Sequence, residues 1–133
     1  MRDFFSMTRR ELGYFGEQIS RFIILQKTGL SSVPSKPFYG DLLLSNGLFV
    51  EVKTVRPNQD GTIRATVYKQ GSQHLGHSNF ILLQVILSND LIDRYIIPSD
   101  IIKTKRIYVN HKLLPYKDAY HLLTASVPLS KAS

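Results

Sequence analysis

Residues 38–44 and 48–55 form two apolar segments joined by a short polar turn, the pattern of a β-hairpin. Charge interrupts this hairpin at only three positions between residues 37 and 55: Asp41, Glu51 and Lys53. An unpaired charge on a buried strand face is energetically costly. Three charged residues in this hairpin therefore favour a functional site. Two carboxylates beside one ammonium favour a site for a divalent metal with hard oxygen ligands, such as Mg²⁺.

The length of the turn decides whether these groups meet. Glu51 and Lys53 share one strand face because side chains alternate along a strand. A two-residue Asn46-Gly47 turn would send Asp41 to the opposite face. A three-residue loop that includes Ser45, with Gly47 in the left-handed region, would set Asp41 across from Glu51. We predict the three-residue loop or an equivalent bulge, because only then do the three charges come together.

The residues Gly40-Asp41 followed by Phe49-Val50-Glu51-Val52-Lys53-Thr54 resemble the motif of the PD-(D/E)xK nuclease superfamily. This superfamily includes restriction enzymes, Holliday-junction resolvases and some homing endonucleases. The similarity covers roughly residues 8–88 and includes Glu17, because many members carry a glutamate on the helix before the first core strand. Gly40 departs from the proline of the family name.

The resemblance implies a restriction-endonuclease-like core and a Mg²⁺-dependent endodeoxyribonuclease, with Mn²⁺ as a substitute metal. Asp41, Glu51 and the Val52 backbone carbonyl would bind the metal against the scissile phosphate. Lys53 would position the attacking water, and Glu17 would bind a metal-linked water or a second ion. Lys69 or Gln70 would contact the phosphate beside the cleaved bond. The expected reaction is phosphodiester hydrolysis that leaves a 5′-phosphate.

The charge of the chain favours a polyanionic partner. Seventeen basic residues face ten acidic ones, which gives a net charge of +7 in 133 residues. Phosphate contacts made by such a chain would supply salt-sensitive affinity for DNA. The candidates for these contacts, besides Lys69 and Gln70, are Arg9, Arg10, Lys103, Lys105 and Arg106. Cutting both strands of a duplex needs two sites, so we expect a homodimer.

The remaining pattern predicts an α/β fold: a single domain of residues 1–133 with a central mixed β-sheet flanked by helices. A capping box at Thr8 and Glu11 opens a helix that ends near Gly29. Its expected core stripe is Leu12, Phe15, Ile19, Phe22 and Ile23, which leaves Glu17 off centre and nearer Ser20 and Ile24. Further strands are expected at residues 63–67, 79–87, 91–98 and 107–109, and helices at 70–75, after an N-cap at Ser99, and at 116–123.

Three further expectations concern the rest of the chain. Residues 31–37 should form a connecting loop, and residues 124–133 a frayed tail. The absence of a membrane-length apolar run and of a secretory signal favours a soluble, cytoplasmic protein with no membrane partner. The absence of cysteine excludes disulfides and zinc–thiolate sites.

Alternatives remain open at this level. The charged hairpin could carry a structural ion pair, and the chain could be a catalytically silent nucleic-acid-binding module on the same fold. RNA is not distinguished from DNA as the substrate. His74 and His77 have a spacing seen in metal sites, but loop or DNA-contact roles fit them better.

Overall fold

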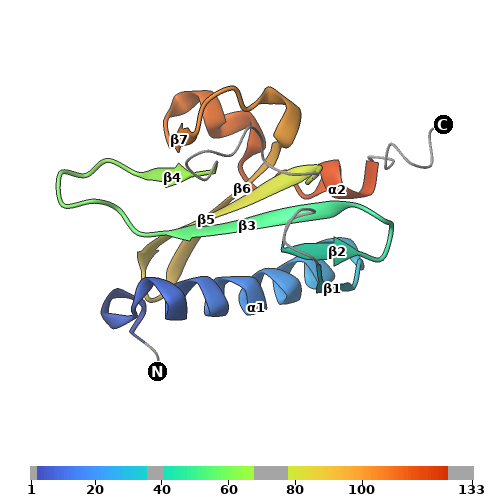
Figure 1. Cartoon of the computed structure of the whole chain (residues 1–133), viewed down its shortest axis with the longest axis horizontal. Helices are drawn as coiled ribbons and strands as arrows, with labels where there is room; N and C mark the ends of the chain where they lie inside the picture. Colours follow the sequence, from blue (N-terminus) through green and yellow to red (C-terminus); the bar gives the residue numbers. More distant parts are fainter. Residues whose placement is uncertain (1–2, 36–40, 68–77, 126–133) are drawn as a thin grey trace.

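The computed structural model describes residues 3–35, 41–67 and 78–125. These residues form two α-helices, seven strands and three short 3-10 helices (Figure 1). The elements are η1 Phe4–Ser6, α1 Arg9–Thr28, β1 Ser32–Pro34, β2 Leu42–Leu44, β3 Phe49–Val55, β4 Arg64–Thr66, β5 Phe80–Ser88, β6 Leu91–Pro98, η3 Ser99–Ile101, β7 Arg106–Tyr108, η4 His111–Tyr116 and α2 His121–Ala125. None of the described helices is long and apolar enough to cross a membrane.

The central sheet has five strands in the order β1-β2-β3-β5-β6. Strands β3 and β5 are parallel and every other neighbouring pair is antiparallel, so the predicted mixed sheet is confirmed. A parallel pair needs a long crossover, and residues 56–79 supply it. Strand β4 lies within this crossover but joins β7 in a separate two-stranded sheet, which we call the ribbon.

The hairpin of β2 and β3 has the predicted three-residue loop. Leu42 pairs with Val50 and Leu43 with Phe49. The Leu44 N–H donates to the Leu48 carbonyl at 2.8 Å, so only residues 45–47 lie in the turn. Gly47 has a φ of +92°, a conformation that residues with a Cβ rarely adopt. The turn therefore sets the register of β2 on β3 as far as Leu42 and Val50.

Helix α1 has the predicted ends but a different buried face. Thr8 and Glu11 form the capping box, and Gly29 closes the helix in the left-handed conformation. The buried residues are Leu12, Gly16, Ser20 and Ile24, whereas Phe22 is 78% exposed. The predicted stripe was wrong at Phe22 but not at Leu12, which is buried, nor at Phe15 and Ile23, which pack partly buried against the core. The centre of the contact has small side chains because α1 packs closely on β3. Gly16 lies against Thr54, where an added Cβ would be 2.7 Å from the Thr54 Cβ.

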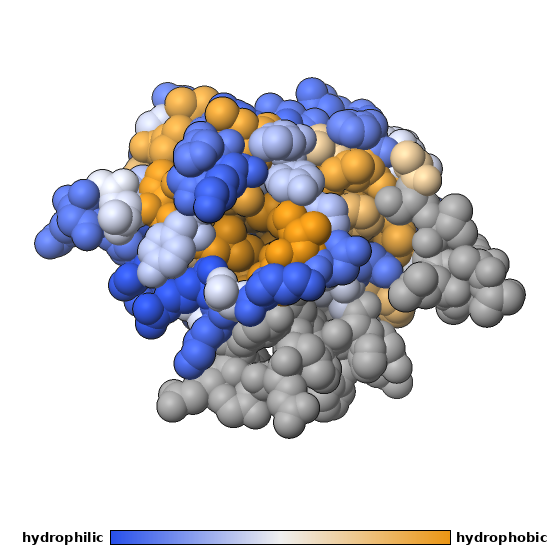
Figure 2. Space-filling model, turned by 90° about the horizontal axis from the view of Figure 1, so that it is seen from above, coloured by the Kyte–Doolittle hydropathy of each residue, from blue (hydrophilic) through white to orange (hydrophobic). Residues whose placement is uncertain are grey.

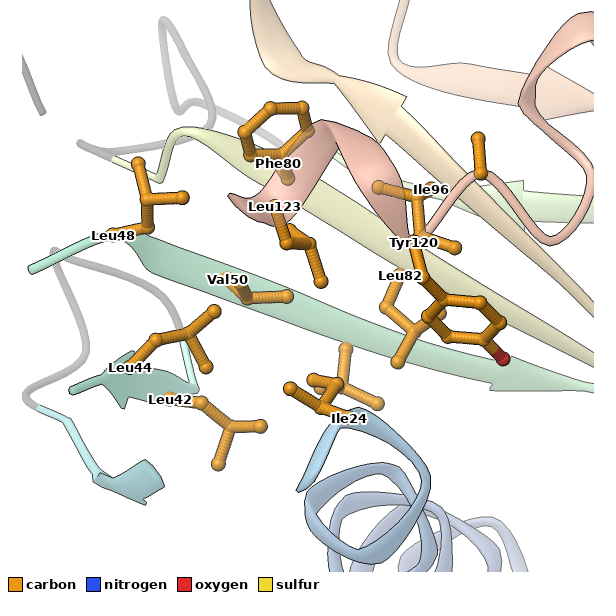
Figure 3. Close-up of a cluster of buried hydrophobic side chains, with 12 residues drawn as sticks. Ile24, Leu42, Leu44, Leu48, Val50, Phe80, Leu82, Ile96, Tyr120 and Leu123 are labelled. Atoms are coloured by element: carbon orange, nitrogen blue, oxygen red, sulfur yellow. The ribbon is translucent and has the colours of Figure 1, made fainter. Parts of the chain in front are cut away.

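The two faces of the sheet are covered differently. Helices α1 and α2 pack on one face, where Ile24 and Leu123 meet the inward side chains of β2, β3 and β5 (Figure 3). The ribbon and η4 cover the other face through Ala65, Ile107 and Leu113 (Figure 1). Among the described residues, the two α-helices therefore flank one face of the sheet, and the ribbon with the 3-10 helix η4 covers the other.

Other sequence predictions need correction in their details. Residues 32–34 form edge strand β1, although the segment was expected to be a loop. Pro98, not Ser99, precedes the short helix η3, and no side chain caps it. The expected helix at 116–123 is instead the end of η4 followed by α2, and Thr124 and Ala125 belong to α2 and not to a tail. The predicted helix at residues 70–75 lies outside the described residues.

Candidate functional site

Asp41 lies immediately before β2, at the point where the pairing of β2 with β3 ends. The last paired residues are Leu42 and Val50, and Asp41 lies one residue beyond them. Its backbone N–H donates to the Val50 carbonyl at 3.0 Å, and its carboxylate Oδ2 accepts from the Val52 N–H at 2.8 Å. The side chain thus takes the place of a strand partner. This contact holds the backbone at Val52, the proposed carbonyl ligand, next to the Asp41 carboxylate.

Glu51 and Lys53 project from the face of β3 that the ribbon covers. Their neighbours Val50 and Val52 point the other way, into the core beneath α1. The Lys53 Nζ lies 3.5 Å from the Glu51 Oε2, and the two side chains keep 32% and 18% of their surface exposed. A partly exposed ion pair adds at most about 1 kcal/mol to stability. The stability of the fold therefore explains only weakly why Glu51 and Lys53 are paired here.

Glu17 reaches the same region from α1. It flanks the buried stripe that ends in Ser20 and Ile24, and it is half-buried. Burial raises the pKa of Glu17 above its ordinary value of 4.5, the nearby Asp41 carboxylate raises it further, and Arg21 acts in the opposite direction. The fold therefore holds two carboxylates near one another, an arrangement that a bound cation would relieve.

The donor set fits Mg²⁺ in its chemistry. Asp41 and Glu51 offer hard carboxylate oxygens, and Mg²⁺ in proteins uses one or two carboxylates and keeps several waters. Within residues 3–35, 41–67 and 78–125, no group of three or more acidic or histidine side chains is close enough to hold a metal ion. Glu17 is therefore no direct third ligand in this conformation. The set that the sequence predicted, two carboxylates with a backbone carbonyl, stays a prediction.

A basic cleft begins at Lys53 and follows β3 away from Asp41. Strand β2 pairs with residues 49 and 50 only, so among the described strands none covers this edge of β3 beyond the hairpin. The cleft encloses about 540 Å³ between the start of α1, the end of β3 and the ribbon. Five cationic side chains and no acidic one are found among the described residues that line it, and these cations are Arg9, Lys53, Arg56, Arg64 and Arg106.

The predicted DNA contacts divide into three groups. Arg9 and Arg106 line the cleft, whereas Arg10, Lys103 and Lys105 are exposed away from its lining. Lys69 and Gln70 lie outside the described residues. Arg56 and Arg64 line the cleft but were not proposed as contacts. The position of Arg64 on the polar side of an alternating strand was a usable signal, but the sequence did not show where that strand would pack.

Comparison with known proteins adds no relative: no protein-family model and no curated protein matches the chain.

The strained position of Glu17 gives a stability prediction. Glu17→Gln should raise the melting temperature of the metal-free protein at pH 7, because the ionised carboxylate is disfavoured by burial and by Asp41. The cost of that charge is complete above the raised pKa and absent below the ordinary pKa of 4.5. The difference between variant and wild type should therefore shrink as the pH falls.

The measurement is thermal melting in EDTA at pH 7 and pH 5. Asp90→Asn, at an exposed position in the β5–β6 turn, is the matched control for the loss of one negative charge. If the melting temperatures of Glu17→Gln and the wild type differ by the same amount at pH 7 and at pH 5, the proposed environment of Glu17 is contradicted.

Proposed function

We propose that this protein is a Mg²⁺-dependent DNA endonuclease that hydrolyses phosphodiester bonds at Asp41, Glu51 and Lys53. The observations that carry the proposal are two contacts along β3: the Asp41 carboxylate accepts a hydrogen bond from the Val52 N–H, and Glu51 forms an ion pair with Lys53, which lines the basic cleft. The restriction-endonuclease-like identity of the core is part of the same proposal. It is supported by an N-terminal helix, an antiparallel meander and a parallel strand reached by a crossover.

Each residue has a separate role in the proposed reaction. Asp41 and Glu51 would hold the metal, with the Val52 carbonyl beside them. Bound Mg²⁺ would supply charge neutralisation at the scissile phosphate and a lower pKa for a bound water. Lys53, at 3.5 Å from Glu51, would orient the attacking water and offset negative charge on the phosphate. Glu17 would accept a hydrogen bond from a water in the site.

The site stands at an accessible edge of the sheet. Glu51 and Lys53 are partly exposed, so a phosphate can reach both. The cleft beyond Lys53 has the charge that a sugar–phosphate backbone needs. Duplex cleavage on both strands would require a second copy of the site, which a two-fold homodimer supplies.

The first experiment is cleavage by the purified protein in Mg²⁺ and in EDTA. The substrates are supercoiled plasmid, a four-way junction, single-stranded DNA and RNA, with Lys53→Ala assayed beside the wild type. We expect Mg²⁺-dependent cutting of DNA that falls in the variant by at least about 100-fold, the effect of losing one transition-state contact.

The preferred DNA substrate would separate a resolvase from a site-specific enzyme. Cutting that persists undiminished in Lys53→Ala would contradict the proposed site. Salt-sensitive DNA binding without any cutting would favour a catalytically silent nucleic-acid-binding module. Preferential cutting of RNA would show that the substrate is RNA and not DNA.

A further inference from the structure

The ribbon carries an unusual outward face. Its buried side is apolar, with Ala65 and Ile107 packed on the central sheet. Side chains alternate along a strand, so the neighbours of these residues point outward. The register pairs Arg64 with Tyr108 and Thr66 with Arg106, which puts two guanidinium groups and one aromatic ring on a single exposed face.

These outward groups are in contact with one another. Hydrogen bonds from Arg106 and Arg64 lower the pKa of the Tyr108 phenol, and the ring is 48% exposed. No described carboxylate forms an ion pair with either arginine. Asp60 is an exposed loop residue whose pKa is lowered first by hydrogen bonds from Thr62 and then by the charge of Arg64. The charge of both arginines is thus presented to solvent.

The same two arginines also line the cleft that starts at Lys53. The ribbon therefore forms one wall of the cleft, and the start of α1, with Arg9, forms part of the opposite side. Viewed from the side of the ribbon, the molecule shows hydrophilic side chains bordering an apolar hollow (Figure 2). Cations beside an exposed aromatic ring are the combination that binds a nucleic-acid strand through its phosphates and one unstacked base.

We propose that the β4–β7 ribbon is a DNA-binding arm that binds an unpaired segment of a DNA strand next to the cleaved bond. Arg64 and Arg106 contact successive phosphates as the strand passes along the cleft, and Tyr108 stacks on one base. The preferred ligand is DNA with at least one unpaired nucleotide, such as a single strand, a flap or an open junction. Only the placement of the cleaved bond beside Lys53 rests on the proposed hydrolase function.

The test is binding without cleavage, measured by fluorescence anisotropy in EDTA with a labelled single-stranded 20-mer and its duplex. The Arg64→Gln/Arg106→Gln double variant should bind the single strand more than about tenfold more weakly. Its salt dependence should fall by about 1.4 in the slope of log K against log salt, which corresponds to two lost phosphate contacts. Lys27→Ala/Lys112→Ala removes the same charge at exposed positions outside the cleft lining and should bind like the wild type.

Tyr108 tests the stacking contact separately. Tyr108→Leu should weaken single-strand binding by at least about fivefold with an unchanged salt slope, and Tyr108→Phe, which keeps the ring, should restore it. Duplex binding should change less in Tyr108→Leu, because paired bases do not reach the ring. Binding of an RNA strand of the same sequence, measured in the same way, shows whether the arm distinguishes deoxyribose from ribose.

The outcomes separate the two proposals. Wild-type affinity in the double arginine variant would overturn the binding arm, and wild-type affinity in Tyr108→Leu would overturn the stacking contact. Binding that behaves as expected in a protein that never cuts would count against the nuclease and leave the arm in place.

Discussion

Replacing Asp41 with asparagine should lower the rate of DNA cleavage by about 1000-fold, and Glu51→Gln should do the same. Asparagine keeps an oxygen that can accept the Val52 N–H, so the hairpin should hold its register. What is lost is the negative charge that would hold Mg²⁺. Both variants should therefore fold, bind DNA in EDTA and fail to cut.

The measurement is single-turnover cleavage of the preferred DNA substrate across a range of Mg²⁺ concentrations. Thermal melting with and without Mg²⁺ gives a readout that needs no catalysis: the wild type should be stabilised by the metal, and both variants should lose that shift. Asp90→Asn makes the same chemical change at an exposed turn and should match the wild type in both assays. Cleavage by Asp41→Asn and Glu51→Gln at the Asp90→Asn rate would remove the two carboxylates from the mechanism.

Gly16→Ala should destabilise the protein by about 2 kcal/mol, although alanine is the better helix former. The added Cβ would lie 2.7 Å from the Thr54 Cβ and still closer to the Thr54 Oγ1, so α1 would have to move off β3. That movement would also disturb a buried hydrogen bond, in which the Gln84 Nε2 donates to the Gly16 carbonyl at 2.8 Å. Because Glu17 follows Gly16 directly, the same shift would displace its carboxylate from Asp41.

Gly13→Ala is the matched control in the same helix. Gly13 is exposed and an added Cβ there meets nothing within 4 Å, so the substitution should stabilise the protein by about 0.5–1 kcal/mol. The two changes are chemically identical and should shift the urea midpoint in opposite directions. Equal shifts would show that helix propensity dominates and that α1 does not pack as closely on β3 as the structure indicates.

The site was predictable where it depended on local chemistry. The three-residue turn with Gly47 follows from short-range backbone preferences, and it fixes the pairing of β2 with β3 as far as Leu42 and Val50. The alternation of β3 puts Glu51 and Lys53 on one face, where they form an ion pair. The helix ends at Thr8 and Gly29 were readable for the same reason, since caps depend on a few neighbouring residues.

Sequence by itself determined the hairpin, the main helix and the order of α and β elements, because each rests on contacts between residues close in the chain. Tertiary structure decided which side of α1 is buried, since Gly16 meets Thr54 across 38 positions and this close approach moves Phe22 to the surface. It also decided that β4 leaves the central sheet for β7, which places Arg64 and Arg106 on the wall of the cleft beside Lys53. Such pairings between distant segments depend on how whole faces fit together, and no local pattern encodes them.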